Sequence, residues 1–191
     1  MGSTNLGVKQ ANTVANIIAV DAVATTAATA KAVISKSTMA TAGRNAIAYV
    51  ELQFAGAGDS WLIPNVKNAS DALASNASSA QKNVVVTTVG SFAVGDLVLL
   101  YENDYTTHEF AKIASITTGT STLTMVGNLT NTYATADGAH ALPIEDWAND
   151  NAYIKVKSGY DWTRDRLNWT SLYLRRMSAV NITVDGVCGV V

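Results

Sequence analysis

The chain has 191 residues and a formal net charge of −2. Charged residues make up 15% of it, against about 25% in ordinary soluble domains. Its polar fraction is carried by Thr, Ser, Asn and Gly, which suits a surface with extensive subunit contacts and equally suits a simple Thr-rich soluble protein. Lys and Arg form no extended basic run, which argues against nucleic-acid binding.

The single cysteine, Cys188, excludes an intrachain disulfide, so the cytosol of the producing cell is an acceptable place to fold. No apolar run is long enough to cross a membrane. The N-terminus lacks the basic and apolar regions of a signal peptide. We therefore expect no membrane association.

Residues 1–43 are rich in Ala, Thr and Val and poor in large apolar side chains. One interpretation is an extended arm that becomes ordered on a neighbouring subunit and loses conformational entropy as it binds. The other is a helix or a strand pair packed on its own domain. Both stay open, and the domain division below uses the arm.

Residues 45–54 alternate apolar and polar side chains, which predicts a strand with one buried face. A Gly-containing loop at residues 56–59 ends it. Residues 67–82 are rich in Ala, Ser and Asn and are expected to form a linker or a short solvated helix. They mark the predicted boundary before the next region.

In residues 83–142, short β-branched runs alternate with Gly, Asn, Asp and Thr, which predicts several short strands. Residues 97–101 are continuously apolar, as expected of a strand covered on both faces. Phe92 and Val94 precede them and are expected to fold back onto the core, beside a tight turn at Gly95. Short strands at this spacing close best as a small barrel.

The order of residues here runs F-x-V-G-D-x-V-x-L, an I-x-x-I step, a Gly-containing turn with T-L-T, and N-L-T-N-T-Y-A-T-A-D-G-A-H-A-L. The residues that carry it are Phe92, Val94, Gly95, Asp96, Val98, Leu100, Ile113, Ile116, Gly119, Leu123, Leu129, Tyr133 and Gly138. This order, over about a third of the chain, resembles small β-barrel modules of tailed-bacteriophage virion proteins, notably head decoration (cement) proteins and some tail proteins.

The C-terminal residues return to strand character. Residues 161–177 fit either a helix or a strand by periodicity, and the β-rich context favours a strand. Asp185-Gly186 lies between β-branched runs and predicts a terminal hairpin. We predict an all-β fold: an N-terminal arm (residues 1–43), a β-sandwich-like layer (residues 44–82 plus 143–191), and a small β-barrel inserted in or joined to it (residues 83–142).

Residues that could carry chemistry are few. His108 and His140 lie outside any Cys/His pattern, so no metal site is expected. No nucleophile stands beside a base in a known motif, so no catalytic residue and no cofactor are expected. The tryptophans fit a sugar-stacking platform or, more commonly, core and interface anchors. Aromatic and Arg residues of the C-terminal third predict a partner interface, made of Trp162, Arg164, Arg166, Trp169, Tyr173, Arg175 and Arg176.

The resemblance implies a non-enzymatic virion structural protein assembled in the host cytoplasm. The function expected first is capsid decoration, in which the chain binds the major capsid protein or other virion proteins, associates with itself, and stabilises the shell. The alternatives are a tail-tube or baseplate subunit and a surface carbohydrate-binding module.

Overall fold

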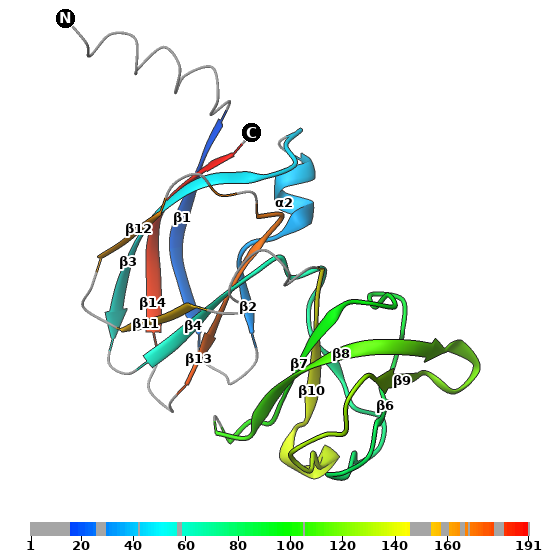
Figure 1. Ribbon diagram of the computed structural model, residues 1–191. Helices are drawn as coiled ribbons and strands as arrows, with labels where there is room; N and C mark the ends of the chain where they lie inside the picture. The colour runs from blue at the N-terminus through cyan, green and yellow to red at the C-terminus, as the bar shows by residue number, and fades with distance from the viewer. Residues whose placement is uncertain are drawn as a thin grey trace, which may run out of the picture.

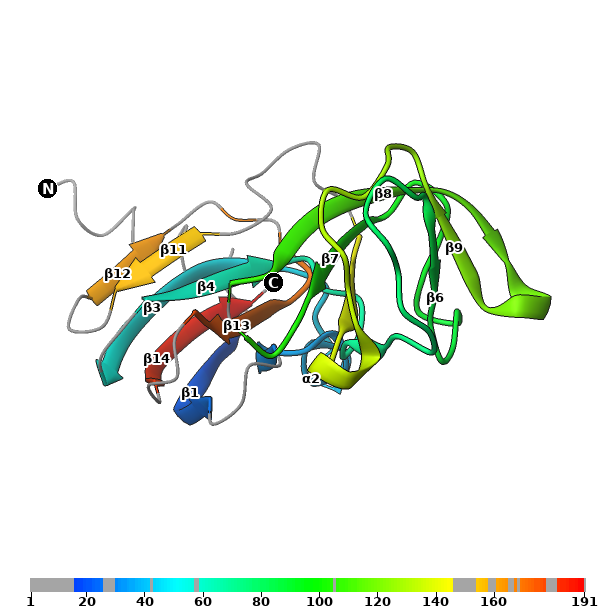
Figure 2. The ribbon, with the colours of Figure 1, turned by 90° about the horizontal axis from the view of Figure 1, so that it is seen from below.

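The computed structural model describes residues 16–25, 30–41, 43–56, 59–104, 106–145, 154–157, 161–164, 167, 169–177 and 182–190. They form two β units, a larger one from both ends of the chain and a smaller one from its middle (Figure 1). The predicted all-β class is confirmed. Figure 2 shows the larger unit as layers of strands, with the smaller unit curled beside it.

The first sheet of the larger unit is antiparallel, in the order β1-β14-β3-β12. Its strands are β1 (Asn16–Thr25), β14 (Ile182–Val190), β3 (Ile47–Gly56) and β12 (Asp161–Arg164). In β3 the apolar side chains of Val50, Leu52 and Phe54 are buried, while Glu51 and Gln53 are exposed. This alternation is the one that the sequence predicts.

The second sheet of the larger unit is also antiparallel, in the order β11-β4-β13-β2. Its strands are β11 (Ile154–Lys157), β4 (Asp59–Pro64), β13 (Leu172–Arg176) and β2 (Lys31–Ile34). One core cluster contains buried residues of both sheets, including Leu52, Leu62, Leu174 and Val184. The sheets are therefore packed face to face, as expected of a β-sandwich.

Part of the segment considered as an arm belongs to these sheets. β1 pairs with β14 from Asn16↔Val190 to Thr25↔Ile182, and β2 pairs with β13. A short helix, α2 (Lys36–Thr41), follows and buries Met39. Strands packed on the chain's own sheets, rather than an arm ordered on a neighbouring subunit, describe these residues, because pairing with the chain's own strands satisfies their backbone groups. Residues 1–15 lie outside the described residues.

The predicted terminal hairpin is wrong. β14 runs through Asp185 and Gly186 as one continuous strand. Gly186 has a φ of 150°, and a Cβ placed on it would lie 2.0 Å from the backbone oxygen of Glu51. The β1–β14 register also shifts between Val20 and Val23. Glycine is therefore required here by a bulge and a close backbone approach, and not by a turn.

The smaller unit is a single curled sheet in the order β5-β10-β7-β8-β9-β6. Its strands are β5 (Asp71–Ala72), β10 (His140–Ile144), β7 (Leu97–Tyr101), β8 (His108–Thr117), β9 (Thr122–Met125) and β6 (Asn83–Val85). The two outer strands meet, because Ala74 N donates to Val85 O at 2.8 Å and Thr87 N to Ala72 O at 3.0 Å. The sheet thus closes into a small barrel.

The barrel includes part of residues 67–82, the predicted linker or short solvated helix. Leu73 and Ala77 are buried in the barrel core, so strand pairing starts at residue 71 and not at residue 83. Phe92 is buried in this core, as predicted. Val94 is 64% exposed, so its predicted place in the core is wrong. The reason is the tight turn in which Asp96 N donates to Ala93 O at 3.1 Å and directs Val94 outward.

Candidate functional site: the joint between the two β units

The chain crosses between the units twice, and the two crossings pair with each other. Lys67 N donates to Pro143 O at 3.0 Å, and Glu145 N donates to Asn65 O at 2.8 Å. Val66 and Ile144 form an antiparallel bridge between them. The connection is therefore two hydrogen-bonded segments, which restricts rotation about either one.

Side chains anchor this crossing to the start of β13. Asn65 adopts a φ of 57°, a conformation that Asn tolerates better than most residues. Its Oδ1 accepts from Thr170 N at 2.9 Å, and its own N–H donates to Ser171 O at 3.1 Å. Ser171 Oγ donates to Val66 O at 2.6 Å.

Glu145 connects three elements at the same place. Its carboxylate accepts hydrogen bonds from Lys36 Nζ on α2 and from Thr170 Oγ1, the latter at 2.7 Å. Burial alone would raise the pKa of Glu145, but the hydrogen bonds from Lys36 and Thr170 hold that pKa below its usual value. The carboxylate is thus kept ionised and acts as a latch between α2, the crossing and the residues that lead into β13.

Next to the crossing, the two units pack against each other through apolar faces. On β4 and β13, alternate side chains face opposite ways: Leu62 and Leu174 enter the sandwich core, while Trp61 and Tyr173 face the barrel. On β7, Leu97, Leu99 and Tyr101 face the larger unit and Val98 and Leu100 enter the barrel core. All five residues of β7 are buried, so the prediction of a strand covered on both faces is confirmed.

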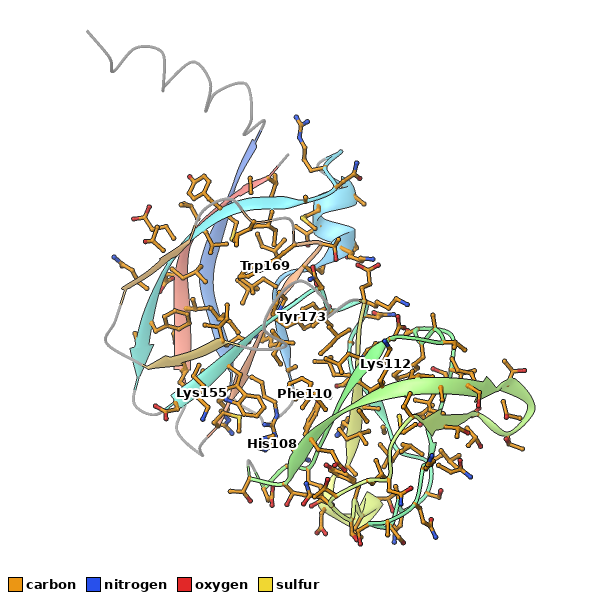
Figure 3. All side chains as sticks on the ribbon, viewed as in Figure 1. His108, Phe110, Lys112, Lys155, Trp169 and Tyr173 are labelled. Carbon is orange, nitrogen blue, oxygen red and sulfur yellow. The ribbon has the colours of Figure 1, made fainter. Side chains whose placement is uncertain are left out.

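Aromatic rings meet across this joint (Figure 3). The Trp61 ring contacts His108 edge-on, with 4.4 Å between centroids, and lies stacked against Phe110 at 6.2 Å. Burial is the main cause that lowers the pKa of His108, and the nearby Arg175 and Lys155 charges lower that pKa further. The His108 imidazole is therefore biased towards its neutral form.

Arg175 fills the centre of the joint. Its side chain is fully buried, and its guanidinium carbon lies 4.5 Å from the Tyr101 ring centroid and 6.0 Å from that of Trp61. Its Nη2 donates to Glu102 O at 3.0 Å. A planar guanidinium can stack on rings and donate within its plane at once, which a lysine cannot do. Arg175 therefore ties β13 to the end of β7.

Four of the seven residues predicted as a partner interface are buried within the chain: Trp169, Tyr173, Arg175 and Arg176. The structure places Tyr173 and Arg175 in the joint and Trp169 in the sandwich core. Trp162 and Arg164 lie on β12, which pairs with β3 at the edge of its sheet as far as the described strands go. Arg166 lies outside the described residues. Partner binding by this region stays a prediction.

Sequence reasoning did not find Trp61, His108 and Phe110 as joint residues. The sequence gives little indication of these contacts, because His108 and Phe110 are only half-buried and lie more than forty positions from Trp61. A short apolar run before a proline predicts an extended segment, but gives no indication of what covers it.

Acidic side chains of the barrel hold its loops. Carboxylate oxygens accept backbone N–H bonds in five places: Asp71 from Thr88 (2.6 Å), Asp96 from Ala93 (2.6 Å), Glu102 from Ala134 (2.6 Å), Asp104 from Thr106 (2.9 Å) and Glu109 from Thr130 (2.8 Å). For Asp104, slight burial would raise the pKa, but hydrogen bonds from Thr107 and Thr106 lower it to about 2. Each of these carboxylates therefore has a structural role.

Within the described parts of the chain, no cluster of three His, Cys, Asp or Glu side chains could hold a metal ion. Over the same residues, no helix is long and apolar enough to span a membrane.

Comparison with known proteins gives little. No family model and no curated protein matches the chain. A solved structure that is similar in part is the Gp54 tailspike of Acinetobacter baumannii bacteriophage AP22, in complex with A. baumannii capsular saccharide. The match has 22% identity and a TM-score of 0.37, and it covers 43% of this chain and 14% of the tailspike. A likeness this partial supports no conclusion about function.

Proposed function

We propose that the chain is a non-enzymatic structural protein of a bacteriophage virion, and that it acts as a capsid decoration protein. In this role it binds neighbouring shell subunits and stabilises the shell through buried contact area. The tailspike likeness carries no weight in this proposal.

The observation that carries the proposal is where the residues of the phage resemblance lie. Seven of them are buried together in the barrel core: Phe92, Val98, Leu100, Ile113, Leu123, Leu129 and Tyr133. Gly95 and Gly138 adopt φ values of 91° and 66°, which glycine tolerates best. The residues that carry the resemblance therefore lie in the core and the turns of the barrel. This distribution is expected when proteins share a fold module, whereas a shared catalytic motif would lie at a site.

The joint supports a clamping role. Paired crossings, the Glu145 latch and the buried Arg175 hold the two units together. A binder whose contact surfaces are held at a fixed spacing loses less conformational entropy on binding than a flexible one. This property suits a protein that contacts two neighbouring subunits at once.

Binding to bare shells tests the proposal. The chain is added to shells of the phage that encodes it, and we expect co-sedimentation and a higher melting temperature of the shells. Arg164→Ala on the edge strand β12 tests the predicted interface and should weaken binding. Lys82→Ala on the exposed barrel surface removes the same charge and should not.

Two other results would redirect the assignment. Stacked rings or tubes of the purified chain in negative-stain images, without shell binding, would contradict decoration and favour a tail subunit. Quenching of Trp fluorescence by a host surface saccharide would favour the carbohydrate-binding alternative. Trp61 and Trp169 are buried, so they cannot supply an exposed stacking platform for that function.

A further inference from the structure

We propose that one end of the barrel, at the loop of residues 130–134, binds a calcium ion through the carboxylates of Glu102 and Glu109 and the side-chain oxygens of Asn131 and Tyr133. The site belongs to the barrel and does not rest on the proposed virion role. Two observations carry it. Two carboxylates outside any described ion pair lie on one short loop, and a buried hydroxyl beside them has no described partner.

The two carboxylates point to the same end of the barrel interior. Glu109 on β8 is the register partner of Leu100 on β7, and Leu100 lies in the barrel core. Glu102 lies two residues after Leu100 and continues the ladder, because its N–H donates to Thr107 O at 3.0 Å. Residues two apart on a strand share a face. Glu102 and Glu109 are therefore diagonal neighbours on that face, roughly 7–8 Å apart along the backbone, which two long side chains can bridge to one ion.

A single loop binds both carboxylates. Glu109 accepts a hydrogen bond from Thr130 N at 2.8 Å, and Glu102 accepts one from Ala134 N at 2.6 Å. These two donors lie on either side of Tyr133 in the chain. A carboxylate has about four lone-pair positions, so each group keeps positions for a cation after it has accepted these bonds.

The Tyr133 hydroxyl gives the second, independent observation. The side chain is fully buried, and its hydroxyl has no hydrogen-bond partner among the described residues. A buried hydroxyl without a protein partner indicates a bound water or ion. Burial is the main cause that raises the pKa of Tyr133, and the charges of Glu109 and Glu102 raise that pKa further, whereas Asn131 lowers it. The hydroxyl thus stays protonated and lies close to both carboxylates.

The charges at this end of the barrel favour a cation over a water. Glu102 is 7% exposed and Glu109 is half-buried, and neither forms an ion pair with a described residue. Residues 113–136, which include most of the loop, contain no Lys, Arg or His. Buried charges are normally paired or coordinate a metal ion, so a bound cation would supply the charge that the chain does not.

The ligands on offer are all oxygens. Asn131 Nδ2 donates to His108 O at 3.2 Å, which leaves Oδ1 as the available end of the amide. With the Tyr133 hydroxyl, the site has two charged and two neutral oxygen groups, and water completes the shell. Such an irregular oxygen set suits Ca²⁺, which takes about six to eight oxygen ligands in flexible geometry, better than Mg²⁺, which requires a regular octahedron.

A groove gives the ion access from solvent. It has a volume of about 300 Å³, and its lining includes Glu109, Asn128 and Thr130. Asn128 and Thr130 are exposed. Lys112 lines the same groove and is exposed, so its ammonium group can stay in solvent while its stem packs on the wall. The site can therefore fill without opening the barrel.

Calcium titration of the full chain, first freed of metal with EDTA, tests the proposal. We expect a Kd on the order of 0.1–1 mM, as in calcium sites with few charged ligands. At about ten times that Kd, Ca²⁺ should raise the melting temperature by roughly 3–6 °C. Mg²⁺ at the same concentrations controls for ionic strength and should have a much smaller effect.

Matched Glu→Gln variants locate the site. Glu102→Gln and Glu109→Gln each remove one charged ligand but keep an oxygen that can accept the loop N–H bond. Each should raise the Kd for Ca²⁺ at least tenfold. Glu51→Gln, at an exposed position on β3 of the larger unit, removes the same charge and should leave the Kd unchanged. Circular dichroism of each variant establishes that it is folded.

Terbium luminescence gives a readout of position. Tb³⁺ replaces Ca²⁺ at oxygen sites and emits strongly when a nearby aromatic ring absorbs the exciting light. Tb³⁺ should therefore emit beside Tyr133, excess Ca²⁺ should remove the emission, and Tyr133→Phe should change it more than the distant Tyr49→Phe does. Absence of both a melting shift and emission well above the expected Kd would mean that the hydroxyl binds only water, which overturns the proposal. An equal response to Mg²⁺, or equal weakening by Glu51→Gln, also overturns it.

Discussion

The two β units differ in how they are assembled from the sequence. The barrel uses one continuous segment, and β7, β8 and β9 pair in chain order. In the larger unit, β1 near one end of the chain pairs with β14 at the other. Contacts close in sequence lose less loop entropy and form sooner. We infer that the barrel can form early, whereas the larger unit requires both ends of the chain.

The units are also held by different interactions. The barrel has a core of its own and five carboxylates that accept backbone N–H bonds from its loops. In the larger unit, two sheets bury a core that includes Leu174, Trp169 and Val184. Loop anchoring and sheet packing are thus separable by mutation. All four tryptophans lie outside residues 71–144, and Trp61 packs against His108 and Phe110 of the barrel. Trp fluorescence therefore reports the larger unit and the joint, whereas circular dichroism reports both units.

The largest effects are expected from matched truncations in the two cores. Leu174 and Leu100 are both fully buried, one in each core. Leu174→Ala and Leu100→Ala should each lower the free energy of unfolding by about 2–5 kcal/mol. In urea denaturation, Leu174→Ala should move the Trp transition directly, whereas Leu100→Ala should move the circular-dichroism transition more than the Trp transition. Identical shifts of both signals in both variants would show that the units unfold as one.

A glycine substitution distinguishes backbone packing in the larger unit from an open turn in the barrel. Gly186→Ala places a Cβ against the Glu51 backbone oxygen at a φ of 150°. It should lower the free energy of unfolding by about 1–3 kcal/mol. Gly119→Ala on the hairpin tip meets nothing within 4 Å and should be nearly neutral. Thermal unfolding of both variants measures the difference, and equal stability would contradict the close approach of β14 to β3.

Loss of a loop anchor in the barrel should have an effect of similar size. Asp96 is buried, and its Oδ2 accepts from Lys67 Nζ at 2.6 Å and from Ala93 N at 2.6 Å. Asp96→Asn removes the charge from this site and should lower the free energy of unfolding by about 1–3 kcal/mol. Asp137→Asn, on the exposed turn η2 (Thr135–Asp137), is the control and should have little effect. An equal effect of both substitutions would show that overall charge is responsible.

The same contrast explains what the sequence could predict. Strand positions in the barrel follow from local signals: β-branched runs, a Gly-Asp turn and a continuous apolar run at residues 97–101. These signals also predict that β7 is covered on both faces. They do not identify Trp61 and Tyr173 as the cover, because those residues come from distant parts of the chain.

The errors arise where distant backbone decides the conformation. Asp185-Gly186 is a strong local hairpin signal, but the glycine is required by β3 passing close to it. Likewise, aromatic and Arg residues are typical of interfaces in composition, and Tyr173 and Arg175 do lie at a contact between two β units. Composition alone does not distinguish a contact within one chain from a contact between two chains.

The smallest effect expected is a pH dependence of the joint. His108 contacts Trp61, and Arg175 and Lys155 lie near it, whereas Thr106 O and Asp104 favour its protonated form. Because its pKa in the folded chain is below 6.5, the folded state binds fewer protons than the unfolded state. The stability linked to His108 is therefore complete above pH 6.5, and it is lost as the pH falls through the pKa that His108 has in the folded chain. His108→Phe keeps an aromatic ring against Trp61 but cannot titrate, so its melting temperature, followed by Trp fluorescence, should fall less over that range. An unchanged pH dependence in this variant would assign the effect to another group and leave the joint insensitive to pH.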